Sequence, residues 1–160
     1  MKKLALALAG VLLLSGCAEM VAQQQAETQK SYNELTECQM PNLRNADDNV
    51  NKQSFISNLT LHAYTSSADN FVMETKFRRL QIVGWDDSVT KSIGDCYSNQ
   101  IAARIDFVKK QFETLKSSTK NKDEKMALIA AYSAWEAYVT SQTEDHKQDF
   151  ESKLSFYKNI

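Results

Sequence analysis

The sequence predicts an all-α fold: a small antiparallel bundle of four or five helices that follows a flexible or helical N-terminal tether and carries one disulfide. Two observations support this fold class. The chain has only 4 glycines and 1 proline in 160 residues, too few for the many turns of a β-sandwich or barrel. Apolar residues also recur at spacings of three and four along several stretches, which is the period of one helix face.

The first predicted elements contain few apolar residues. Residues 18–30 are good helix formers with little to bury, so we expect a tether there. Residues 31–40 carry Tyr32, Leu35 and Cys38 on one helix face. Pro41 ends this helix, because the residue before a proline avoids the helical region.

Two helices are predicted between residues 49 and 83. Asp47 or Asp48 caps the first, over residues 49–65. The polar residues 65–67 form a weak break, and Asp69 is placed to cap the second helix. Gly84 is placed to end it.

The strongest helical signal follows a cap at Asp86 or Asp87 and reaches Ser117 and Ser118, about 30 residues in all. Eight apolar residues follow a 3.6-residue period: Val89, Ile93, Tyr97, Ile101, Ile105, Val108, Phe112 and Leu115. Cys96 lies beside this stripe, so it is positioned to face Cys38.

The last helical stretch starts at Asp123. Its stripe is Leu128, Ala131, Trp135, Tyr138 and Gln142. Residues 143–149 are polar, and Phe150, Leu154 and Tyr157 then resume the helical spacing. The pattern leaves two alternatives open, a continued helix or a new one.

The N-terminus has the layout of an export signal. Lys2 and Lys3 precede an apolar run over residues 4–14, which is shorter than the roughly 20 residues of a membrane-spanning helix. Leu14, Ser15, Gly16 and Cys17 then resemble the lipobox of bacterial lipoproteins. The alternatives are an ordinary cleaved signal with a chance cysteine, or a buried N-terminal helix.

The lipobox resemblance implies a lipid anchor. Residues 1–16 would be a signal peptide, residues 17–30 a lipidated tether and residues 31–160 a helical domain. The Cys17 thiol would carry diacylglycerol and the new α-amine a further acyl chain such as palmitate; more than one chain holds a protein firmly on a bilayer. Ala18, in place of aspartate, implies the outer membrane, with the domain facing the periplasm.

Export also bears on the two remaining cysteines. Two thiols in an oxidising compartment allow one pairing, and we therefore expect a Cys38–Cys96 disulfide. Two buried free thiols are the alternative. The mature chain, with 17 basic and 20 acidic residues, has no surplus of positive charge to hold nucleic acid, so none is expected as a partner.

The richest aromatic patch is Tyr132, Trp135 and Tyr138. It is a candidate partner-binding stripe, because aromatic anchors dominate interface energies. A stripe at helical spacing is more often core, and that interpretation is favoured here.

The sequence shows no arrangement expected of an enzyme. It has no nucleophile–histidine pair, phosphate-binding loop or metal-ligand spacing, so we expect no catalytic residues, metal or cofactor. Asp86 and Asp87 are adjacent and point in different directions, which suits helix capping better than paired catalytic carboxylates.

The predicted function is therefore a non-enzymatic, lipid-anchored adaptor at the outer membrane that binds an unknown envelope protein. The overall plan is similar to that of secretin pilotins of the PulS/OutS type, which implies a groove that captures a helix of a secretin subunit. The other alternative is a periplasmic inhibitor of a cell-wall hydrolase.

Overall fold

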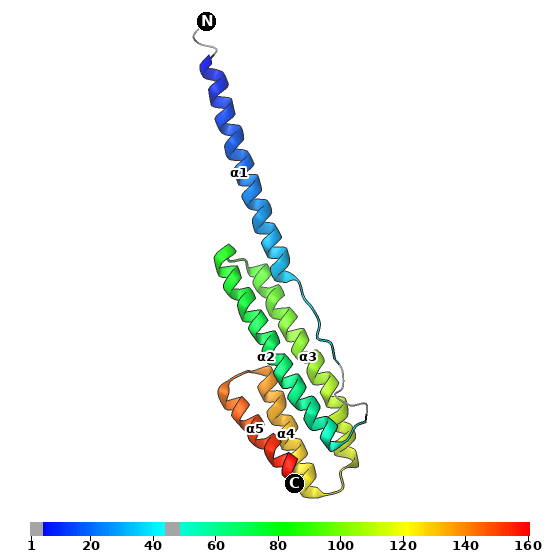
Figure 1. Cartoon of the computed structure of the whole chain (residues 1–160). Coiled ribbons are helices and arrows are strands. Elements are labelled where there is room, and N and C mark those ends of the chain that lie inside the picture. Colours follow the sequence, from blue (N-terminus) through cyan, green and yellow to red (C-terminus); the bar gives the residue numbers. More distant parts are fainter. Residues whose placement is uncertain (1–4, 44–48) are drawn as a thin grey trace.

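The structure is a computed structural model that describes residues 5–43 and 49–160, with side chains from Met20 onward in those ranges. It confirms the predicted all-α bundle with one disulfide. The described residues form five helices and no strand (Figure 1). The helices are α1 (Ala5–Thr36), α2 (Lys52–Val83), α3 (Asp87–Ser118), α4 (Lys122–Thr140) and α5 (Glu144–Asn159).

An antiparallel hairpin of α2 and α3 is the spine of the molecule (Figure 1). Each of these helices has 32 residues, about 48 Å of helix. The shorter hairpin of α4 and α5 packs beside the half of the spine that holds the start of α2 and the end of α3. The last turns of α1 pack on the other half, and the rest of α1 extends beyond the bundle.

Helix α1 settles the choice between a flexible and a helical tether. The predicted tether is helical, and it is continuous with the segment that carries Leu35. The helix ends at Thr36, however, and not at Met40 as the position of Pro41 suggested. The hydroxyl of Thr36 bonds to the carbonyls of Tyr32 and Asn33, and the chain then leaves the helix toward α3. The prediction that Cys38 is helical was wrong.

Helix α2 runs without the break predicted at residues 65–67. The hydroxyls of Thr65 and Ser67 bond to the carbonyls of Leu61 and Ala63 in the preceding turn, so these polar residues are satisfied inside the helix. Asp69 is therefore not a cap.

The observed caps agree with the sequence in part. Asp86 caps α3, accepting hydrogen bonds from the main-chain N–H groups of Ser88 and Val89. Helix α4 begins one residue earlier than predicted, after an Asn121 cap, and α5 is a new helix capped by Thr143. Asp47 and Asp48 lie outside the described residues. Asn51, together with Ser54, caps α2.

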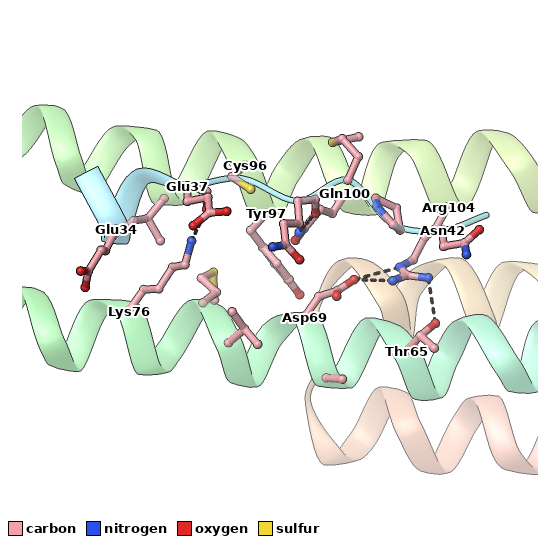
Figure 2. A pocket seen from close by; sticks show the side chains of 17 residues that line it. Glu34, Glu37, Asn42, Thr65, Asp69, Lys76, Cys96, Tyr97, Gln100 and Arg104 are labelled. Carbon is pink, nitrogen blue, oxygen red and sulfur yellow. Dashed lines mark hydrogen bonds and ion pairs between the residues drawn. The ribbon is translucent and has the colours of Figure 1, made fainter. Parts of the chain in front are cut away.

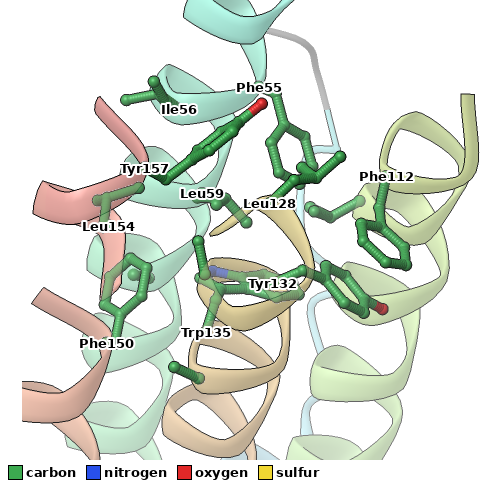
Figure 3. Packing of buried hydrophobic residues seen from close by; sticks show 14 of the residues in the cluster. Phe55, Ile56, Leu59, Phe112, Leu128, Tyr132, Trp135, Phe150, Leu154 and Tyr157 are labelled. Carbon is green, nitrogen blue, oxygen red and sulfur yellow. The ribbon is translucent and has the colours of Figure 1, made fainter. Parts of the chain in front are cut away.

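The larger core cluster lies where the α4–α5 hairpin packs on the spine (Figure 3). Trp135 is fully buried at its centre, and the Tyr132 ring stacks on Phe112 with centroids 4.1 Å apart. Tyr138 is half-buried, and its hydroxyl lies 2.9 Å from that of Ser67. The core interpretation is thus confirmed, and the proposed partner-binding role is wrong for Tyr132 and Trp135 because neither ring reaches the surface.

A smaller cluster holds the end of α1 on the spine. Leu35 of α1 is buried against Leu80 of α2 and against Val89 and Ile93 of α3. Burial of these few side chains fixes α1 at the turn between α2 and α3, where the hydroxyl of Tyr32 donates a hydrogen bond to the carbonyl of Gly84.

Candidate binding cavity

A short non-helical segment, residues 37–43, runs from the end of α1 along α3; we call it the strap (Figure 2). Three attachments hold it to the spine. The predicted disulfide joins Cys38 to Cys96 of α3, with their Cα atoms 5.7 Å apart. Lys76 of α2 donates to the carbonyl of Glu37, and Gln100 of α3 donates to the carbonyl of Gln39 at 2.7 Å. The strap is therefore fixed to both helices of the spine.

A cavity of about 480 Å³ lies between the strap, α2 and α3 (Figure 2). Its apolar lining comes mainly from the spine: Ala68, Val72, Met73 and Ile93. Its polar lining includes Glu34, Glu37, Asp69, Lys76, Tyr97, Gln100 and Arg104. Two of its lining residues, Val72 and Met40, are 52% and 56% exposed, so the cavity is open to solvent. A ligand could reach it without unfolding of the domain.

A buried ion pair forms one end of the cavity. Arg104 is 4% exposed, and its Nε and Nη2 atoms both donate to Oδ2 of Asp69, the former at 3.0 Å. Its Nη1 atom donates to Thr65 Oγ1 at 2.8 Å and lies 3.3 Å from Nδ1 of His62. Such a paired guanidinium brings no net charge to the cavity.

Burial also shifts the pKa of two side chains that line the cavity, Lys76 and Tyr97. Burial lowers the pKa of Lys76, and the nearby Glu37 carboxylate offsets part of that effect. Burial also raises the pKa of Tyr97, to which the Asp69 carboxylate adds. At neutral pH, the cavity wall therefore presents a protonated phenol.

The remaining predicted residues are placed as follows. Cys17 lies within α1, and its side chain lies outside the described residues. Among the described residues there is no group of three or more histidine, cysteine or acidic side chains that could hold a metal ion. None of the helices in the described ranges is long and apolar enough to cross a bilayer.

The sequence analysis missed the cavity, although one signal for it was present. Arg104 falls on the same helix face as Ile101 and Val108, and a charged residue within an apolar stripe needs a partner. Its partner, Asp69, was interpreted as a cap. Nothing local in the sequence connects these two residues, which are 35 positions apart.

We compared the chain with protein-family models, curated proteins and solved structures, and none of them matches it significantly.

Proposed function

We propose that this protein is a non-enzymatic adaptor, anchored by acyl chains on Cys17 at the periplasmic face of the outer membrane, which binds a segment of another envelope protein in the cavity under the strap. The observation that carries the proposal is the cavity itself, which has an apolar floor, a polar rim and an opening to solvent. Binding sites in proteins typically combine these properties.

The N-terminal part of α1 supports the anchoring half of the proposal. Thr36 lies 19 positions after Cys17 in α1, which is about 28 Å of helix. From Met20 to Glu27 the side chains are exposed, so this stretch makes no packing contact with the bundle. It would hold the cavity away from the bilayer, where a partner has access to it. Anchoring would also raise the effective concentration of the adaptor near a membrane-bound partner.

A photo-crosslinking experiment tests the proposal. A photoreactive amino acid replaces Val72 at the cavity rim in the acylated full chain, in living cells. We expect one dominant protein adduct, and a much weaker one when Cys17→Ser prevents acylation. The matched control replaces Phe156, which is 60% exposed on α5, on a different part of the surface.

Two results would contradict the proposal. Equal adducts at positions 72 and 156 would mean that the cavity is not the binding site. Mass spectrometry that finds no lipid on Cys17 of the native protein would remove the anchor.

A further inference from the structure

We infer that the strap acts as an isolated edge strand, so that a partner segment binds in an extended conformation along it and places an uncharged side chain in the cavity. This inference rests on the proposed function and specifies the conformation and chemistry of the bound segment. It comes from the main-chain groups of the strap, which the rest of the molecule leaves largely without partners.

The main-chain N–H groups of the strap are available for hydrogen bonds. Glu37 N–H still bonds to a carbonyl of α1, but the main-chain N–H groups of residues 38–43 make no hydrogen bond within the part of the chain that the structure describes. In an all-helical protein, such a segment is unusual, because most main-chain groups bond within helices. A non-helical segment with unpaired main-chain groups can serve as a template for an added strand.

The attachments of the strap indicate which groups a partner can reach. The carbonyl of Gln39 faces α3, because it accepts from Gln100. The carbonyl of Glu37 accepts from Lys76 of α2, so both of these carbonyls already have a donor. The N–H of Met40 bonds to no described residue, and Met40 is 56% exposed, so a partner can reach this group.

The cavity determines which side chain the segment brings. Arg104 and Asp69 neutralise each other, and Ala68, Val72 and Met73 supply apolar surface. A charge from the partner that entered beside this pair would find Arg104 and Asp69 already paired with each other, and it would lose its hydration. An aliphatic side chain has no charge whose hydration would be lost on entering the cavity. A segment in which aliphatic and polar residues alternate therefore fits both the strap and the cavity.

The strap is already ordered before a partner arrives. The disulfide and the two side-chain donors fix its path, and Pro41 restricts its backbone further. A preorganised edge avoids the entropy cost of ordering a loop on binding.

The experiment selects binders from a phage library of random eight-residue peptides, using the full chain in detergent micelles. The affinity of the selected peptides is then measured for two variants. Met40→Pro removes one N–H from the strap, and the matched Met40→Ala keeps that N–H but shortens the side chain. We expect Met40→Pro to weaken binding at least tenfold relative to Met40→Ala, because a main-chain hydrogen bond is lost.

Nuclear magnetic resonance gives a second readout. Carbon chemical shifts of the bound peptide should report an extended backbone, and the Met40 amide should become protected from exchange. A helical bound peptide, equal binding by the two variants, or the absence of any selected peptide would overturn the inference. A helical peptide in the cavity would leave the proposed function intact, whereas failure of crosslinking at position 72 would remove the function itself.

Discussion

The two ends of the α2–α3 spine are held in different ways. The end that packs against α4 and α5 has a continuous apolar core, in which Phe55, Leu59, Leu128 and Trp135 are fully buried. Among the described residues, the core cluster at the end that receives α1 has four buried apolar side chains, and this end adds a disulfide and hydrogen bonds to the strap. Burial of apolar surface stabilises the end that packs against α4 and α5. The end that receives α1 depends more on the disulfide and on hydrogen bonds.

This difference places the residues that contribute most to stability at one end of the spine and the candidate binding cavity at the other. The candidate cavity lies at the end with the smaller core, where less packing has to be preserved around an opening. Binding surfaces are commonly placed in such less tightly packed regions of a fold. Changes in the large core should therefore alter the stability of the whole domain, and changes near the strap should alter local order.

The largest expected effect is at Trp135. Trp135→Ala should lower the free energy of unfolding by about 3–5 kcal/mol, because it opens a cavity in the centre of the larger core. Urea denaturation followed by circular dichroism measures this change. The matched control is Trp85→Ala, at 59% exposure, which should change stability by about 0.5 kcal/mol or less. Similar losses for the two variants would show that the core is not where the structure puts it.

The next effect is that of the disulfide. Replacing Cys38 and Cys96 together by serine frees a loop of 58 residues, which should cost about 4 kcal/mol in the chain-entropy model. Hydrogen exchange should then rise most in the strap and at the end of α1, while the slowest amides of α4 should lose no more protection than the loss of global stability accounts for. Uniform loss of protection would show that the two ends unfold as one unit.

A smaller effect is expected for the ion pair in the cavity. Arg104→Met leaves Asp69 without its main cation and should cost about 2 kcal/mol, less than for a fully buried pair because the Asp69 side chain is 22% exposed. Adding Asp69→Leu should recover most of that loss. A double variant as unstable as the sum of both single variants would argue against the pairing.

The smallest effect at neutral pH concerns Tyr132. Its buried hydroxyl makes no hydrogen bond, so Tyr132→Phe should be nearly neutral at pH 7. Burial raises the pKa of Tyr132 to about 12, from near 10 in the unfolded chain, so the folded state favours the protonated phenol. This contribution is complete below pH 10 and is lost as the pH rises toward 12.

Unfolding at alkaline pH therefore tests whether ionisation of the buried Tyr132 destabilises the larger core. Tyr157, whose pKa is also raised by burial to about 12, contributes in the same direction. Tyr132→Phe should move the midpoint of alkaline unfolding to higher pH. An unchanged midpoint would show that ionisation of Tyr132 does not drive that transition.

The sequence predicted those parts of the fold that depend on local periodicity. The stripe from Val89 to Leu115 gave the bounds of α3 almost to the residue, because one side of this helix faces the core along its length. The cysteine pairing followed once Cys17, one of three cysteines, was set apart as the expected site of lipid attachment. The interior position of the aromatic stripe was also the favoured interpretation.

Features that depend on distant partners could not be predicted. The polar residues of α2 looked like a break, because the sequence does not show that Ser66 is buried under the amide of Gln142. The end of α1 was misplaced for a similar reason, since the strap is held by Lys76 and Gln100, far along the chain. The cavity exists only where these long-range contacts meet.

Because α1 is one unbroken helix from Ala5 to Thr36, the direction in which the cavity faces, relative to Cys17, depends on the number of residues between Cys17 and the bundle. Each residue of an α-helix adds 1.5 Å and a rotation of about 100°. Deleting a single residue between positions 20 and 30 would rotate the cavity by about 100° around the axis of α1, while its distance from Cys17 would change by only about 1.5 Å. Inserting seven residues would move the cavity about 10 Å farther from Cys17 and, after nearly two full turns, leave it facing almost the original direction.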